Sequence, residues 1–455
     1  MNFLRIVSVG ILTAAFLSSG EDLTIEKNLS GYASLEEGQI VQGSYSIASS
    51  ALRLDHVWVQ RMYTGLVGNM LFNPFNIEGN IGCEMRVSNE FPRVKASRGD
   101  QGVTRRLYFY PYLTEADFKY HIGDKANPVF SLTGGYFPIK YNTNSRNLGE
   151  YLFRSGAYPQ TLVTDFDFAA TRLFGLDVSA SPIKGLSMSV ILNSNVEWQA
   201  IGDLNLSGLV SYNFKDIFEL GAGISQTSIV SADSKITDGD SANAGPEMKY
   251  IKSSNGPDTT IGLLSFRGTK VMAMASFDPL NLMKNTFGFS LDFFGKEDLK
   301  LYSEVAILGL ESFPITLDSC TDYSDIGKRI PVMFGFNFPA FKLLDVLSIE
   351  GEWFGGIMPN NLAGVVFYDE PTPITSDNRL NYLVAKRNGG KKYNEDNWKW
   401  SVYAKRTLAG HFQIIGQVAS DHMRWFAQDW TRQDWEEAFR NPRQFYYRFK
   451  LAYMF

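Results

Sequence analysis

The last twelve residues, QFYYRFKLAYMF (444–455), alternate strictly between two kinds of side chain. Every second residue back from the end is large and apolar or aromatic, and the residues between them include Arg448 and Lys450. Successive side chains of a β-strand point to opposite faces, so this period of two indicates a strand with one entirely apolar face. A soluble antiparallel sheet could end in such a strand, but its exposed edge would promote aggregation. A barrel closed in lipid has no edge and needs an apolar outer face, so the pattern favours the membrane barrel.

This strand also resembles the carboxy-terminal signal of bacterial outer-membrane β-barrels, in which a final aromatic residue follows apolar residues at alternate positions. The resemblance implies that the outer-membrane barrel assembly machinery recognises the strand. It also implies a porin-like protein of the Gram-negative outer membrane, in contact with lipid and lipopolysaccharide, and it leaves a homotrimer open. The matching residues are Phe449, Leu451, Tyr453 and Phe455.

The amino terminus has the layout of a secretory signal peptide. Arg5 precedes an apolar run over 6–17, and small residues at 18–20 come before Glu21, so we expect cleavage after Gly20. The remaining chain has no stretch approaching the ~20 consecutive apolar residues of a transmembrane helix. We therefore expect residues 1–20 to be removed, 21–55 to form a periplasmic segment with room for the first strand, and 56–455 to form the barrel.

Composition agrees with a barrel but does not decide the class. The chain has 34 Phe, 22 Tyr and 40 Gly, which suits lipid-facing bands, aromatic girdles and tight turns. A hydrophobic share of 44% and a charged share of 20% would equally suit a soluble enzyme. The net charge of −5 and the absence of a basic tract argue against a nucleic-acid partner.

Alternating segments recur along the chain without a persuasive long amphipathic helix between them, which excludes a βαβ architecture. Short connections such as 181–185 and 406–410 alternate with long polar ones such as 231–258 and 357–395. This arrangement predicts an all-β, transmembrane antiparallel barrel of about 16 strands (14–18), with short periplasmic turns and long extracellular loops. An even count requires a strand before Val57, which we place within 40–52, and the trace is weakest over 278–298.

A barrel of this size encloses a lumen wide enough for water, so the predicted function is a porin for passive diffusion of small hydrophilic solutes. Strand parity places charges of both signs on the inner face, which is natural in a water-filled channel, although a plugged barrel would show the same pattern. The pore-lining candidates from the strands are Glu84, Arg86, Arg106, Asp165, Asp167, Glu350, Glu352, Lys399, Lys405, Arg448 and Lys450.

The segment 134–167 is the most distinctive connection. It contains Pro138 and Pro159, and a strand followed by such an Arg-bearing loop resembles the inward-folding constriction loop of porins. If the loop folds inward, Arg146 and Arg154 would face an acidic wall bearing Glu350 and Glu352 and set the field that selects ions. An ordinary extracellular loop is the alternative. The loop candidates are Lys140, Arg146, Glu150 and Arg154.

A second aromatic-rich stretch, 424–447, suggests a function of another class. Trp425, Trp430 and Trp435 could stack against sugar rings, although such residues more often belong to the interfacial belt. The alternative to a porin is therefore a surface adhesion or scaffold barrel that binds polysaccharide or partner proteins through its long loops.

Enzymatic readings find little support in the sequence. Asp421 and His422 are adjacent, and neighbours on a strand point to opposite faces, so they form a poor dyad unless the strand has already ended. Three aspartates in 233–247 lack the spacing of a calcium loop, and no zinc or nucleotide motif is present. We predict no enzyme activity, no cofactor and no metal.

Overall fold

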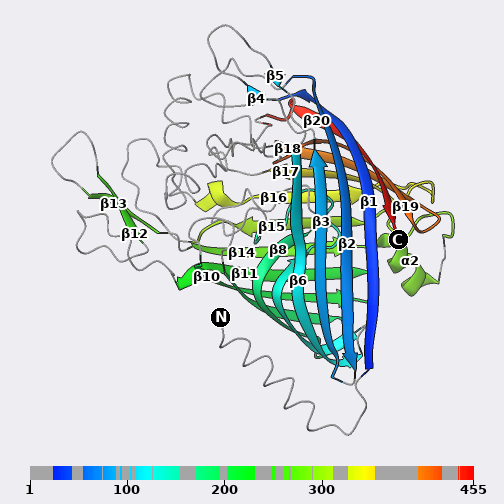
Figure 1. Cartoon of the computed structure of the whole chain (residues 1–455), viewed down its shortest axis with the longest axis horizontal. Helices are drawn as coiled ribbons and strands as arrows, with labels where there is room; N and C mark the ends of the chain where they lie inside the picture. Colours follow the sequence, from blue (N-terminus) through cyan, green and yellow to red (C-terminus); the bar gives the residue numbers. More distant parts are fainter. Residues whose placement is uncertain are drawn as a thin grey trace.

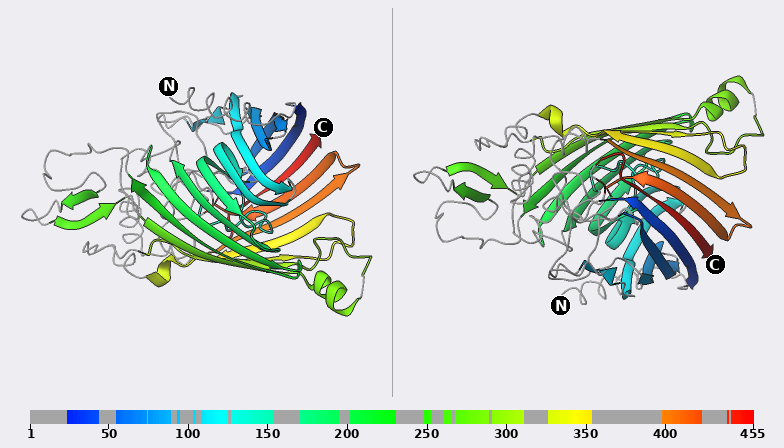
Figure 2. Two further views of the ribbon diagram at one scale, coloured as in Figure 1. Left: turned by 90° about the horizontal axis from the view of Figure 1, so that it is seen from below. Right: turned by 90° about the horizontal axis from the view of Figure 1, so that it is seen from above.

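The chain forms one closed antiparallel barrel of sixteen strands. The structure is a computed structural model that describes residues 24–43, 55–73, 75–88, 93–94, 103–104, 108–124, 127–153, 170–194, 202–230, 248–252, 260–265, 268–288, 291–310, 326–353, 398–422, 439 and 441–455. Figures 1 and 2 show the strands wrapping around a common interior. In order around the barrel the strands are β1 (Thr24–Gln42), β2 (Val57–Asn73), β3 (Ile77–Ser88), β6 (Tyr108–Asp124), β7 (Asn127–Ile139), β8 (Thr171–Ala180), β9 (Leu186–Ser194), β10 (Leu204–Phe214), β11 (Phe218–Val230), β14 (Gly268–Phe277), β15 (Leu301–Ile307), β16 (Val332–Asn337), β17 (Val346–Trp353), β18 (Trp398–Leu408), β19 (Phe412–Ser420) and β20 (Phe445–Met454).

The barrel closes where the first strand meets the last. β20 pairs with β1 in a register that joins Leu35 to Leu451 and Glu36 to Lys450, and Phe455 exchanges two backbone hydrogen bonds with Gly31. The predicted count of 16 is confirmed. The position of the first strand was wrong, because β1 occupies Thr24–Gln42 and not 40–52.

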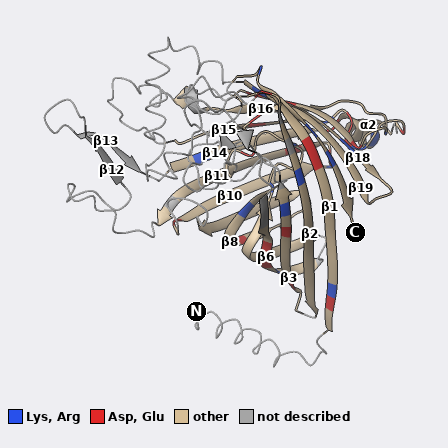
Figure 3. Cartoon of the chain, turned by 45° about the horizontal axis from the view of Figure 1, so that its top comes forward, with Lys and Arg blue, Asp and Glu red and all other residues tan. Residues whose placement is uncertain are grey.

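The two faces of the wall differ as the alternation predicts. The outward residues of β20 from Tyr447 onward are exposed, between 37% for Tyr447 and 48% for Phe449, whereas Glu36, Glu350 and Lys399 on inward positions are buried. Most of the strand surface in Figure 3 carries no charged residue. An apolar exterior around a polar interior is the arrangement of a barrel that meets lipid outside and polar groups inside.

Connections at one end of the barrel are short, and those at the other end are long. The short ones include 74–76, 181–185, 215–217 and 409–411, while the long ones include 89–107, 231–267 and 354–397. Two hairpins, β4 (Arg93–Val94) with β5 (Val103–Thr104) and β12 (Met248–Lys252) with β13 (Thr260–Ser265), lie within long connections, as does the 3-10 turn η2 (Ile326–Arg329).

The connection 278–300 departs from this scheme, because it belongs to the short end but carries helix α2 (Pro279–Phe287). Asp278 caps this helix by accepting from the backbone N–H of Asn281 at 2.9 Å, Pro279 fits the first turn, and Gly288 ends it at φ 70°. Its presence explains why 278–298 could not be traced as a strand. No helix in the described part of the chain is long and apolar enough to cross a membrane.

Candidate functional site

The first part of the connection after β7, residues 140–153, lies inside the barrel. Residues 140–153, here called the luminal loop, are mostly buried, and Leu148 and Leu152 have no exposed surface. Leu148, Leu152 and Phe153 pack with inward side chains that include Leu173 of β8 and Met333 of β16. Because burial of an apolar side chain contributes about 1.5–3 kcal/mol, this cluster holds the loop firmly against one wall.

Three glutamates of that wall bind the main chain of the luminal loop. Glu350 of β17 accepts hydrogen bonds from the backbone N–H groups of Arg146, Asn147 and Leu148, the last two at 2.8 and 2.9 Å. The hydroxyl of Tyr302 donates to the same carboxylate at 2.8 Å. Buried N–H groups need acceptors, and a carboxylate is a strong one. Glu350 therefore acts as a cap for the tip of the loop.

Glu304 of β15 performs the same task further along. Its carboxylate accepts from the backbone N–H groups of Glu150 and Tyr151, each at 2.9 Å, and from the side chains of Tyr141 at 2.6 Å and Asn142 at 2.9 Å. Burial, followed by the negative charge of Glu304, raises the pKa of the Tyr141 hydroxyl well above its ordinary value. Tyr141 therefore stays protonated and remains a donor.

Glu352 of β17 completes the set. Its Oε2 accepts from the hydroxyl of Tyr151 at 2.9 Å and from the backbone N–H of Gly149 at 3.4 Å, and its Oε1 contacts Nε2 of His422. Gly149 has φ +83°, and a Cβ there would lie 2.8 Å from a methyl carbon of Met333. Only glycine fits this left-handed turn so close to the wall.

Two further groups hold the loop from other strands. The buried amine of Lys270 on β14 donates to the carbonyl groups of Tyr151 at 3.0 Å and Leu152 at 3.4 Å. Asp421, just beyond the end of β19, accepts from the side chain of Asn147 at 2.7 Å and from the hydroxyl of Tyr446 at 2.8 Å. Wall groups thus bond the loop at Tyr141 and Asn142 and again over 146–152.

Three of the four predicted loop charges lie in the described residues, and each has a partner in or beside the loop. The guanidinium of Arg146 pairs with Glu297 at 2.9 Å, not with Glu350 or Glu352, and Lys140 donates to the carbonyl of Ser145 at 2.8 Å. Glu150 is buried at φ 60° and accepts from the backbone N–H of Asn142 at 3.3 Å. The side chain of Arg146 therefore does not pair with the glutamate wall, and the selectivity field expected from the loop stays a prediction.

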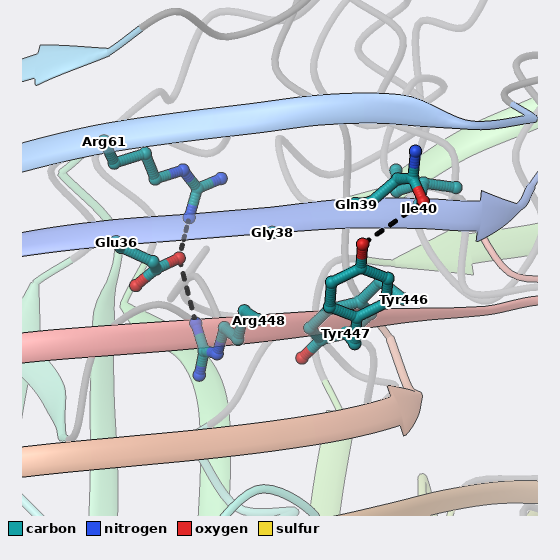
Figure 4. A pocket seen from close by; sticks show the side chains of 8 residues that line it. All are labelled: Glu36, Gly38, Gln39, Ile40, Arg61, Tyr446, Tyr447 and Arg448. Carbon is teal, nitrogen blue, oxygen red and sulfur yellow. Dashed lines mark hydrogen bonds and ion pairs between the residues drawn. The ribbon is translucent and has the colours of Figure 1, made fainter.

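On another part of the lumen wall, β20, β1, β2 and β3 carry a cation-rich strip. Arg61 of β2 and Arg448 of β20 each lie 3.6 Å from the same oxygen of Glu36 on β1. Figure 4 shows both guanidinium groups approaching this carboxylate beside Gly38, in a small cavity that also reaches Tyr446 and Tyr447. Arg448 also donates from Nε to Gln417 at 2.7 Å.

Aromatic rings support the other cations of the strip. Arg86 of β3 lies over the ring of Tyr63 at 5.0 Å and over that of Tyr112 at 4.6 Å, and the amine of Lys450 lies over Tyr63 at 5.0 Å. Arg86 also pairs with Glu84. The strip defined by Arg61, Arg86, Arg448 and Lys450 against Glu36 and Glu84 has a formal charge of +2, and ring faces add stabilisation to its cations.

The remaining strand candidates do not join this strip. Lys399 is buried with its amine on the carbonyl of Phe439, so it does not form part of an open basic wall, and Lys405 is half-buried on β18. Arg106, Arg154, Asp165, Asp167, Trp425, Trp430 and Trp435 lie outside the described residues.

Sequence reasoning missed Glu36, Arg61, Lys270 and Glu304. Glu304 has a usable signal, since in LYSEVAI (301–307) it shares its parity with inward Tyr302. Asp421 and His422 were set aside because strand neighbours diverge, but β19 ends at Ser420 and both side chains are buried. Among the described residues, no cluster of three or more His, Cys, Asp or Glu could hold a metal ion.

Comparison with known proteins adds the following. No family model matches the sequence, and no curated protein matches it. Similar solved structures include a triple mutant of the Rhodopseudomonas blastica porin, with 9% sequence identity and a TM-score of 0.42, and another mutant of the Rh. blastica porin, with 8% identity and a TM-score of 0.43. Each match covers 94% of this chain and 100% of the other. The closed barrel is established by the strand pairing itself.

Proposed function

We propose that this protein is an outer-membrane channel through which small hydrophilic solutes diffuse passively. The observation that carries the proposal is the luminal loop, held inside a closed sixteen-strand barrel by wall carboxylates. Barrels of about 16 strands leave an aqueous interior, and an inward loop narrows it without needing to fill it. The charged inner face, with an apolar face outside, supports the same function.

The arrangement of charge supports a modest preference for anions. Glu304, Glu350 and Glu352 are engaged with the luminal loop, whereas the cation-rich strip lines another part of the wall. Cationic side chains that line a pore favour anions. The apolar row of β20, with Tyr453 and Phe455 exposed, suits both lipid contact and the proposed handling by the barrel assembly machinery.

The test is single-channel conductance of the purified, folded protein in a planar bilayer, with the reversal potential measured under a salt gradient. We expect steady steps and the sign of an anion-preferring pore. Replacing Arg448 by Gln should shift the reversal potential toward cations, whereas Lys215→Gln, at an exposed turn, should not. A folded barrel that conducts nothing would overturn the channel.

A further inference from the structure

Large apolar side chains are exposed on two connections at the short-connection end of the barrel. Exposed fractions are 63% for Phe287, 55% for Phe293, 51% for Phe341 and 77% for Leu343. Phe341 stacks on Phe293 with ring centroids 6.2 Å apart and on Phe294 at 5.5 Å. These five residues, called the aromatic foot, come from two connections, 278–300 and 338–345.

The aromatic foot is built on a well-bonded scaffold. The fully buried carboxylate of Asp298 accepts from the backbone N–H groups of Gly295 at 2.8 Å and Phe341 at 3.1 Å, and so ties the two connections together. Asn281 and Asn285 of α2 donate to carbonyl groups of the neighbouring turn, Asp216 at 3.1 Å and Lys215 at 3.0 Å. The connections that carry the phenylalanines are therefore held by hydrogen bonds to each other and to the neighbouring turn.

The aromatic foot extends the exposed apolar surface on the outer face of the barrel wall. Phe334 on β16 is 54% exposed and Phe338, just beyond that strand, is 39% exposed, so exposed phenylalanines run from the strand into the foot. Figures 1 and 2 show α2 at the rim of this end, beyond the ends of β14 and β15.

Exposed lysines accompany the phenylalanines. Lys284, Lys296 and Lys342 are exposed on the same two connections. Exposed apolar patches of this kind mark interaction sites, and aromatic rings with adjacent lysines are the composition of segments that lie at a membrane interface. Amines there would meet anionic headgroups while the rings enter the acyl boundary.

We propose that the aromatic foot inserts into the lipid interface of the membrane leaflet at the short-connection end, with a phospholipid surface as its occupant. The inference rests on the proposed membrane location of the barrel. It assigns to the connection 278–300 a role in anchoring the rim, beyond solute passage.

Depth measurement with spin labels tests this placement. In a background with Cys83→Ser and Cys320→Ser, a nitroxide is attached at Phe293→Cys or Leu343→Cys, and the protein is folded into vesicles of phosphatidylethanolamine and phosphatidylglycerol. Power saturation compares relaxation by oxygen, which partitions into lipid, with relaxation by a water-soluble nickel complex. Phe334→Cys on the outer wall and Lys184→Cys on an exposed short turn serve as lipid and water controls.

We expect the ratio of oxygen to nickel relaxation at 293 and 343 to be several-fold above that at 184 and to approach that at 334. If the ratios at 293 and 343 equal the ratio at 184 while the ratio at 334 is that of a lipid-exposed label, the insertion of the foot is overturned and the membrane barrel still stands. Labels that neither relaxant reaches would mean that protein covers the foot, which also overturns a lipid occupant. A water value at 334 would overturn the membrane location itself, and the foot with it.

Discussion

Removal of the Glu350 carboxylate is the sharpest test of how the luminal loop is held. In Glu350→Ala, the backbone N–H groups of Arg146, Asn147 and Leu148 lose their acceptor. Leaving a buried donor unsatisfied costs about 1–3 kcal/mol. Water in the lumen offsets part of that cost, so we take about 1 kcal/mol for each group and about 3 kcal/mol in all. At 1.4 kcal/mol per factor of ten, the equilibrium for local opening of the loop rises about a hundredfold.

Two measurements report the local opening of the luminal loop. Amide hydrogen exchange at 146–148 should accelerate about a hundredfold while exchange in the strands stays unchanged, because opening is local. Single channels should show larger and noisier conductance. Glu78→Ala is the matched control, since it removes another buried luminal glutamate, on β3, whose carboxylate accepts from the side chain of Asn69. Equal loop exchange in the two variants would refute the capping role of Glu350.

Three smaller perturbations address the same interior. Gly149→Ala should destabilise the folded barrel by about 1–3 kcal/mol, through left-handed strain and contact with the wall, in urea unfolding followed by the band shift on unheated gels. Gly79→Ala, where a Cβ meets nothing within 4 Å, should change stability far less, and equal losses would contradict the role of the turn. Tyr151→Phe removes a 2.9 Å bond to a wall carboxylate and should raise channel noise less than Glu350→Ala, which leaves three N–H donors without their acceptor, and the reversal potential should stay unchanged. Charge reversal in Arg448→Glu should move the reversal potential further toward cations than Arg448→Gln, and no difference between them would show that the strip does not control passage.

The alternation of apolar and polar residues, together with the position of the last strand, predicted most of the barrel. The period of two in 444–455 identified β20, and an even count required a strand before Val57. That strand was misplaced because TIEKNLSGYASLEEGQIVQ (24–42) has Lys27 and Glu37 at the positions that share a face with Leu29 and Leu35. Its place in the barrel comes from pairing with two neighbours, which local pattern does not reveal.

The hydrogen bonds that hold the loop were harder to predict than its inward course, because most of their donors are backbone N–H groups. Arg146 pairs through its side chain with Glu297, but both side chains are partly exposed, at 22% and 27%, and pairs of that kind contribute about 0–1 kcal/mol. The main-chain N–H groups that meet Glu304 and Glu350 are buried and contribute more, yet every residue except proline has such a group. The sequence therefore pointed to the charged side chains of the loop as its contacts. Most of the stabilisation comes instead from backbone N–H groups, which no sequence pattern distinguishes. The sequence signal for these contacts lies in the strands of the wall, where glutamates occupy inward positions and serve as acceptors for the loop.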